Sequence, residues 1–207
     1  ESESRGLGDV YKRQIQDQDA FVKAVNQAIP LAQDGNLVTF GIKPKEAHTG
    51  YGYIKMGTQV KGGFDVDRFV EKPSIDVARE YFDSDLYLWN SGMFLFRASR
   101  YLEELEKFRP DIYKSCMDAV DKLESDLDFL RINKELFSEC PSESIDCAVM
   151  EKTQYAVVVP MDAGWNDIGS WSSLWEISKK DNKGNAINGD VILQNTKECY
   201  VRAEDRL

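Results

Sequence analysis

Histidine and cysteine are scarce in this 207-residue sequence, which holds one histidine, His48, and four cysteines. The cysteines lie far apart with no Cys-x-x-Cys pair, whereas zinc sites need several Cys or His ligands at close spacing. A zinc site is therefore not expected, and the cysteines are expected to be reduced thiols. His48 lies in a polar segment without a nucleophile setting, so we expect it in a surface or substrate loop rather than as a catalytic base.

Basic residues are in the minority, with 26 lysines and arginines against 36 acidic residues and a net charge of −10. Nucleic acids and anionic membranes bind clustered Lys and Arg, so neither is an expected partner. Long apolar runs are lacking too. The run Tyr155–Met161 is far too short to cross a bilayer, and nothing near Glu1 has the apolar core of a signal peptide. These features predict a cytoplasmic protein.

Hydrophobic residues make up 42% of the sequence, which is enough to form a sizeable buried core. Strand-like and helix-like segments alternate, which predicts an α/β fold with a mixed sheet and a β-hairpin. The expected strands are Leu37–Ile42, a hairpin of about Tyr51–Met56 and Asp67–Val70 around a Gly62-Gly63 turn, Leu86–Phe96, Tyr155–Pro160, and runs near Val191–Leu193 and Cys199–Val201. Six helices are expected. They are one from near Asp19 to before Gly35, one from a Ser74 cap to about Tyr81, Ala98–Phe108, Asp111–Leu130, a short helix within Ser144–Lys152, and one from Ser170 to about Lys179.

The tripeptide Glu71-Lys72-Pro73 follows a strand, so the proline fixes a turn from which two opposite charges emerge. The lysine can meet a phosphate as a point charge, and the glutamate can accept hydrogen bonds from sugar hydroxyls. The alternative, a solvated turn, is the more frequent structure for such a tripeptide taken alone.

Three further motifs supply context. Thr49-Gly50-Tyr51-Gly52 sets two glycines around an aromatic, so that backbone amides can face a ligand; the alternative is a plain hairpin entry. Asn90 and Gly92 interrupt an apolar strand, where a buried amide needs a partner such as a sugar hydroxyl. Asp146 lies near the start of a short helix, where it either joins the same site or only supports the helix N-terminus.

Asp167 is the strongest metal-ligand candidate, in a Gly- and Trp-flanked turn that spans residues 164–171. Mg²⁺ takes carboxylate oxygens and keeps waters and substrate phosphates as its other ligands, so one or two protein carboxylates suffice. An aspartate in this sequence could instead cap the following helix. The flanking glycine and tryptophan residues favour the metal.

These motifs, in this order and spacing, resemble those of sugar-1-phosphate nucleotidylyltransferases, and most closely the bacterial mannose-1-phosphate guanylyltransferases. The segments that carry the resemblance are Gly41–Ile54, Phe69–Pro73, Trp89–Phe96, Ile145–Lys152 and Asn166–Trp171. The resemblance implies a Rossmann-like nucleotidyltransferase domain that joins GTP and mannose 1-phosphate into GDP-mannose, with Mg²⁺ as cofactor and diphosphate as the other product.

The resemblance also implies roles for single residues. Lys72 and Asp167 are expected to be catalytic, with Asp167 as the Mg²⁺ ligand. The residues expected to bind the sugar phosphate are Thr49, Gly50, Tyr51, Gly52, Glu71, Lys72, Asn90, Gly92 and Asp146.

Against the family pattern, the N-terminal nucleotide-binding strand and loop are expected to be missing. Residues 1–14 are expected to be an extraneous or disordered leader, residues 15–180 a partial catalytic domain, and residues 181–207 the start of a C-terminal β-rich extension. An inactive fragment is therefore expected. The alternatives are a non-catalytic sugar-phosphate-binding or regulatory module and a hexose-1-phosphate nucleotidylyltransferase of other specificity. A homodimer is the assembly considered.

Overall fold

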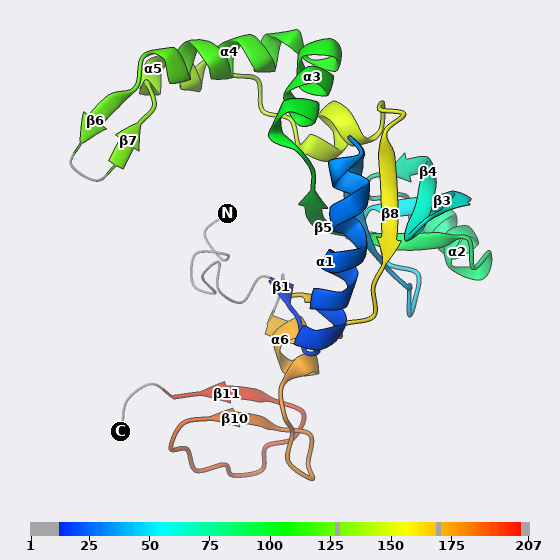
Figure 1. Cartoon of the computed structure of the whole chain (residues 1–207). Coiled ribbons are helices and arrows are strands. Elements are labelled where there is room, and N and C mark those ends of the chain that lie inside the picture. Colours follow the sequence, from blue (N-terminus) through cyan, green and yellow to red (C-terminus); the bar gives the residue numbers. More distant parts are fainter. Residues whose placement is uncertain (1–12, 127–128, 169–170, 204–207) are drawn as a thin grey trace. The chain divides into compact units, whose positions relative to one another are not determined.

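The computed structural model describes residues 13–126, 129–168 and 171–203. These residues form two compact units (Figure 1). The larger unit spans Asp19–Asp162. The smaller unit joins the described residues up to Gln18 with those from Ala163 onward.

The larger unit is built on a mixed sheet of five strands. They are β2 (Leu37–Ile42), β3 (Tyr53–Val60), β4 (Gly63–Val70), β5 (Tyr87–Leu95) and β8 (Ala156–Pro160). Their order is β2-β5-β3-β4-β8, and β8 pairs back with β2, so the sheet closes into a barrel. Only the β2–β8 pair is parallel among these strands. The predicted α/β class, mixed sheet and hairpin are confirmed, with both hairpin strands longer than expected.

Continuous apolar runs explain the two parallel strands. All six residues of β2 and the first four of β8 are buried, which is typical of strands covered on both faces. On one side, helix α1 (Gln18–Gln33) packs Phe21 against Phe40 of β2, with ring centroids 6.4 Å apart.

The main core cluster joins the sheet to three helical segments. These are α3 (Ala98–Phe108), α4 (Pro110–Asp121) and the one-turn π-helix η3 (Asp146–Met150). Leu105, Ile112 and Val149 pack with strand residues in this cluster. Burying one such side chain contributes about 1.5–3 kcal/mol. The cluster therefore holds η3, and with it Asp146, at a fixed place beside the sheet.

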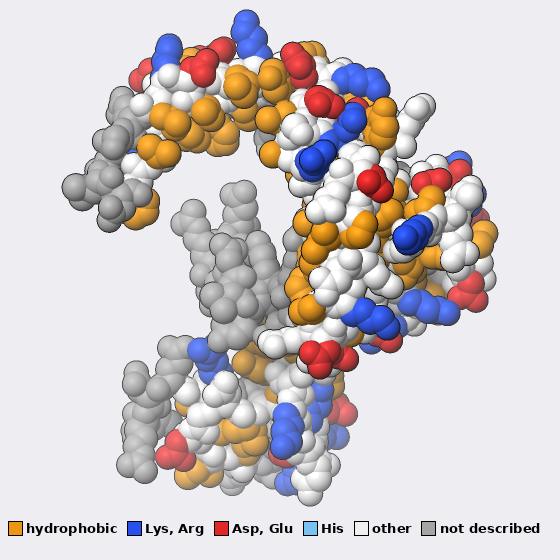
Figure 2. All heavy atoms as spheres, in the orientation of Figure 1, with side chains coloured by type: hydrophobic (Ala, Val, Ile, Leu, Met, Phe, Trp, Pro, Cys, Tyr) orange, Lys and Arg blue, Asp and Glu red, His pale blue; other side chains and the backbone are white. Residues whose placement is uncertain are grey.

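The predicted helix Asp111–Leu130 is wrong in its second half. Helix α4 ends at Asp121, and a short hairpin follows, β6 (Glu124–Asp126) with β7 (Phe129–Arg131). The apolar spacing continues past Ala119, but Val120 and Leu123 are 44% and 40% exposed. Little apolar surface is therefore buried there to stabilise a further helical turn. Figure 2 shows hydrophobic side chains gathered on the surface along α4 and α5 (Lys134–Ser138).

Two other helices match their predicted positions. Helix α2 (Ile75–Asp83) begins after Ser74, although the Ser74 side chain makes no capping hydrogen bond. Helix α3 has the predicted bounds. No helix within the described ranges is long and apolar enough to cross a membrane.

The smaller unit contains short elements only. They are β1 (Arg13–Gln14) paired with β9 (Asn166–Asp167), helix α6 (Trp171–Ile177), and β10 (Ala186–Asn188) paired with β11 (Tyr200–Arg202). The strand predicted near Val191–Leu193 is wrong, because the strand lies earlier, at Ala186–Asn188. The reason is the buried Asn185, whose amide donates to Asp181 and to the Thr196 carbonyl and fixes that segment. Most of the predicted leader, and residues 169–170, lie outside the described residues.

Candidate functional site

Asn90 is the centre of a polar cluster in the larger unit. Its Nδ2 donates to Asp146 Oδ1 at 3.0 Å, and its Oδ1 accepts from the Gly92 N–H at 3.1 Å. The Thr39 hydroxyl lies 3.1 Å from the same Oδ1. The side chain is thereby fixed in one orientation. The residue is 9% exposed. The Asp146 contact uses one of the two amide hydrogens, and the amide can offer the second to a ligand.

Local backbone features place this amide. The β2–β5 register shifts between Thr39 and Gly41, and the bulge sets Asn90 opposite Gly41. Gly92 has φ +65°, a conformation that favours glycine, and this lets its N–H turn back to Asn90. Sequence reasoning missed Thr39, whose signal was a lone hydroxyl within the apolar run of β2.

Gly52 and Glu71 join the same cluster. The Asn90 N–H donates to the Gly52 carbonyl at 2.8 Å. A Cβ at Gly52 would lie 2.6 Å from Glu71 Oε2 and 3.3 Å from the Asn90 Cβ, so only glycine lets the carboxylate approach this closely. The structure thus brings together Gly52, Glu71, Asn90 and Asp146, which come from different parts of the sequence.

The two carboxylates make the cluster acidic. Burial, and then the nearby Asp146 carboxylate, raise the pKa of Glu71, and the Lys72 ammonium only partly opposes them. The Lys72 Nζ lies 3.5 Å from Glu71 Oε1, but the Lys72 side chain is 63% exposed, so the ion pair is weak. The cluster thus combines carboxylate acceptors and the Asn90 amide with a solvent-facing cation beside them.

Lys72 itself has an unusual backbone. Its φ of +47° lies in the left-handed region, which is uncommon for residues other than glycine and costs free energy. Such outliers are concentrated at ligand sites, where the surrounding structure enforces them. The exposed ammonium is free to move toward a phosphate, which is the role predicted for it.

The loop before β3 holds the other predicted ligand-binding residues. Thr49 and Gly50 are exposed, and Tyr51 is half-buried. The Tyr51 ring lies edge-on to Trp89 with centroids 4.9 Å apart. The loop therefore borders the polar cluster through Gly52 and Trp89, while Thr49 and Gly50 face solvent.

Asp167 lies in the smaller unit and is half-buried in β9. The preceding turn needs glycine, because Gly164 has φ +61° and a Cβ there would lie 2.8 Å from the Gln16 Cβ. Among the described residues, no group of three or more His, Cys, Asp or Glu side chains could hold a metal. A single carboxylate still fits Mg²⁺, which binds through one or two carboxylates, waters and phosphates. The neighbouring Asn166 Oδ1, buried without a hydrogen-bond partner in the described structure, adds a second oxygen of the hard type.

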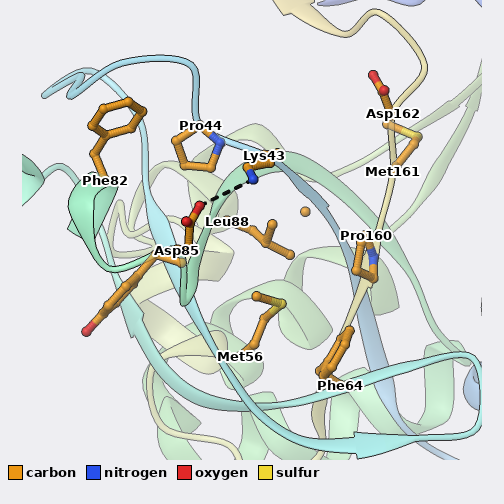
Figure 3. Close-up of a pocket in the computed structure, with 12 residues that line it drawn as sticks. Lys43, Pro44, Met56, Phe64, Phe82, Asp85, Leu88, Pro160, Met161 and Asp162 are labelled. Carbon is orange, nitrogen blue, oxygen red and sulfur yellow. Dashed lines mark ion pairs between the residues drawn. The ribbon is translucent and has the colours of Figure 1, made fainter.

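A separate cavity of about 560 Å³ opens at one end of the sheet (Figure 3). Figure 3 shows Met56, Phe64 and Leu88 around it, with the Lys43–Asp85 ion pair of 3.3 Å at its edge. None of the predicted site residues lines this cavity. Its walls are mostly apolar, so the polar cluster is the better candidate for binding a sugar phosphate.

Comparisons with known proteins identify the family. Residues 10–184 match the family described as nucleotidyl transferase. The chain is 56% identical over 191 residues to the mannose-1-phosphate guanylyltransferase of Salmonella muenchen, covering 92% of this chain and 40% of that protein. It is 55% identical over 198 residues to the mannose-1-phosphate guanylyltransferase of Escherichia coli K12, covering 93% and 41%. The chain thus spans about two fifths of the length of these curated relatives.

Two solved structures are similar to this chain. A structure described as mannose-1-phosphate geranyltransferase from Thermus thermophilus matches with a TM-score of 0.74 and 28% identity, covering 86% of this chain and 51% of that one. A structure described as mannose-6-phosphate isomerase from Helicobacter pylori matches with a TM-score of 0.70 and 38% identity, covering 75% and 61%. The predicted fold class and family resemblance are confirmed, and the chain belongs to the nucleotidyl transferase family.

Proposed function

We propose that this protein transfers a nucleotidyl group from GTP to α-D-mannose 1-phosphate, giving GDP-mannose and diphosphate. Two lines of support meet in this proposal. Relatives at 55–56% identity bear the name mannose-1-phosphate guanylyltransferase. The cluster of Gly52, Glu71, Asn90 and Asp146 offers acceptors and one amide donor beside an exposed lysine, a set suited to sugar hydroxyls and a phosphate. The cluster is the observation that carries the proposal.

In the reaction, an oxygen of the sugar phosphate attacks the α-phosphorus of GTP. A new P–O bond forms, the bond from the α-phosphorus to the bridging oxygen breaks, and diphosphate leaves. Phosphoryl chemistry of this type needs positioning and charge neutralisation more than covalent help from the protein. Asn90, Glu71 and Asp146 orient the hexose in this proposal. Lys72 neutralises and aligns the attacking phosphate.

Asp167 is the proposed Mg²⁺ ligand, on the strength of its carboxylate, its half-buried position and the adjacent Asn166 oxygen. Bound Mg²⁺ would neutralise charge on the triphosphate as it reacts.

A sugar-phosphate-binding module without transferase activity is the second candidate. It needs the same cluster but no metal, and the described residues contain the polar cluster but no group of three or more His, Cys, Asp or Glu side chains that could hold a metal. The two candidates differ in one observable, the release of diphosphate.

The deciding experiment measures diphosphate release by the folded chain with GTP, mannose 1-phosphate and Mg²⁺, alongside calorimetric titration with mannose 1-phosphate. Asn90→Ala should weaken sugar-phosphate binding about tenfold, because the variant loses one amide contact to the ligand and frees Asp146 from its partner. Lys61→Ala, in the β3–β4 turn, is the matched control and should bind as the wild type does.

The outcomes separate the candidates. Binding with diphosphate release supports the transferase, and release with glucose 1-phosphate at an equal rate would instead support another hexose specificity. Binding without release, in a chain that circular dichroism shows to be folded, supports the binding module. Absence of binding by the folded wild type contradicts both.

A further inference from the structure

His48 makes a hydrogen bond that shapes the ligand-facing loop. Its Nδ1 accepts from the Gly50 N–H at 3.0 Å. This contact, from a side chain to the N–H two residues on, is the geometry by which Asn and Asp side chains build turns. The imidazole therefore acts as a turn-forming acceptor, and Nδ1 must be unprotonated to do so.

The backbone of His48 is fixed as well. Its N–H donates to the Tyr53 hydroxyl at 3.0 Å, and its carbonyl accepts from that hydroxyl at 3.0 Å. Tyr53 is fully buried in β3 and is the first residue of that strand. The loop is thus closed on itself, from the residue before Thr49 to the residue after Gly52.

The imidazole ring is also held by stacking. It lies on the Tyr51 ring with centroids 4.2 Å apart and planes at 19°, and edge-on to Trp89 at 6.4 Å. Tyr51 in turn meets Trp89 at 4.9 Å. The neighbouring strand β5 thereby supports the loop, one residue away from Asn90.

Only glycine fits at position 50, next to this imidazole. A Cβ at Gly50 would lie 2.7 Å from His48 Cε1 and 3.1 Å from Nδ1. The loop conformation thus depends on the pair of a histidine at one position and a glycine two residues later. The same loop leads directly into Gly52, whose approach to Glu71 and Asn90 forms the polar cluster.

We propose that His48 is a positioning residue that fixes the loop of residues 49–52 in the conformation that receives the sugar phosphate. It touches neither substrate nor metal in this role and acts through the Gly50 amide and the Tyr51 ring. The inference rests on the proposed function, because it assumes that the loop borders a sugar-phosphate site.

Two substitutions separate the roles of the side chain. His48→Phe keeps a ring that can stack on Tyr51 but removes the acceptor. His48→Asn removes the ring but supplies an oxygen that can accept from the Gly50 N–H in the same turn geometry. A residue that merely fills space would be replaced better by phenylalanine, whereas the proposed role predicts rescue by asparagine.

The test combines mannose 1-phosphate titration with hydrogen exchange of the Gly50 amide in the ligand-free protein. We expect His48→Phe to weaken binding about 3- to 10-fold, the value of one net hydrogen bond, and to speed Gly50 exchange by a similar factor. His48→Asn should stay within about twofold of the wild type in both measurements. Thermal unfolding of each variant shows that the fold is retained.

The results decide the two proposals separately. If the wild type binds no mannose 1-phosphate, the proposed function fails, and Gly50 exchange alone then decides whether His48 orders the loop. If His48→Phe leaves both binding and Gly50 exchange unchanged, or if His48→Asn is impaired more than His48→Phe, the positioning role of His48 is overturned.

Discussion

At the scale of single residues, we expect Glu71 to trade stability for binding of the proposed sugar phosphate. Burial and the Asp146 carboxylate raise its pKa, so the folded chain holds the proton more tightly than the unfolded chain does. The stabilisation that accompanies protonation is present below the ordinary carboxyl value of about 4.3 and is lost as pH rises through the raised pKa. At pH 7 the ionised Glu71 therefore lowers the free energy of unfolding.

The substitution Glu71→Gln tests this trade. At pH 7 we expect an unfolding temperature equal to or above that of the wild type, with mannose 1-phosphate affinity reduced about tenfold or more, because a charged acceptor is lost. The stability gain should shrink at pH 4, where Glu71 of the wild type is protonated. Thermal melts at both pH values, together with titration calorimetry, check this. A variant less stable than the wild type at pH 7 would contradict the assignment.

Two substitutions of Lys72 separate the effect of its charge from the effect of its strained backbone. Lys72→Ala removes the ammonium but keeps a side chain at φ +47°, whereas Lys72→Gly removes both the ammonium and the steric cost. We expect both variants to lose affinity for mannose 1-phosphate while affinity for mannose is unchanged. The glycine variant should be the more stable of the two by about 0.5–1 kcal/mol in urea unfolding. Equal binding of the phosphate by wild type and both variants would remove Lys72 from the site.

At the scale of elements, α4 and the segment after α5 meet through two thiols. Cys116 Sγ and Cys140 Sγ lie 3.9 Å apart, and both cysteines are free. Oxidised glutathione would join them in two exchanges. The Cys140 thiolate attacks the glutathione disulfide and releases one glutathione thiolate. The Cys116 thiolate then attacks the mixed disulfide and releases the second, so two protein thiols are oxidised as one oxidant disulfide is reduced.

We expect this exchange to be slow at neutral pH, because burial and the neighbouring Cys140 raise the pKa of Cys116. Once formed, the disulfide closes a loop that stabilises the chain by about 3 kcal/mol and raises its unfolding temperature. Peptide mass spectrometry should find Cys116 linked to Cys140, and Cys116→Ser should abolish both the link and the rise. A linkage of either residue to Cys147 or Cys199 instead would refute the predicted pairing.

The elements that sequence reasoning placed well are those with a local signal. Strand β2 and helix α3 have the predicted bounds, because a continuous apolar run and a helical apolar period each identify one structure. The helix predicted to reach Leu130 failed, because its period continued where no partner buries it. The strand at Ala186–Asn188 was missed because hydrogen bonds of Asn185, which no hydropathy pattern records, fix that segment.

At the scale of the whole molecule, the site is a product of tertiary structure. The motifs around Glu71, Asn90 and Asp146 were visible as polar interruptions, but only the closed sheet and the core beneath η3 bring them together. Thr39 and the acceptor role of His48 depend on contacts that residue types alone do not reveal. Sequence patterns therefore predicted the residues of the candidate site, and the fold determines how these residues are arranged.

We predict a division of roles in which metal binding and sugar-phosphate binding are separable, because different residues are proposed for each. The polar cluster lies wholly in the larger unit, while Asp167 lies in the smaller one. Mannose 1-phosphate should bind equally well with Mg²⁺ and with excess EDTA, to within about twofold, because no member of the cluster is a proposed metal ligand.

Two matched substitutions of a carboxylate by an amide test this division. Asp146→Asn should weaken mannose 1-phosphate binding about tenfold with or without Mg²⁺. Asn90 Nδ2 loses its charged acceptor, and the sugar loses a carboxylate acceptor in the site. Asp167→Asn should leave that affinity unchanged and abolish Mg²⁺-dependent diphosphate release wherever the wild type shows it. Titration calorimetry with Mg²⁺ and with EDTA measures the first effect, and a coupled diphosphate assay measures the second. If Asp167→Asn weakened sugar-phosphate binding as much as Asp146→Asn does, the two carboxylates would share one function, and assigning only Asp167 to the metal would be wrong.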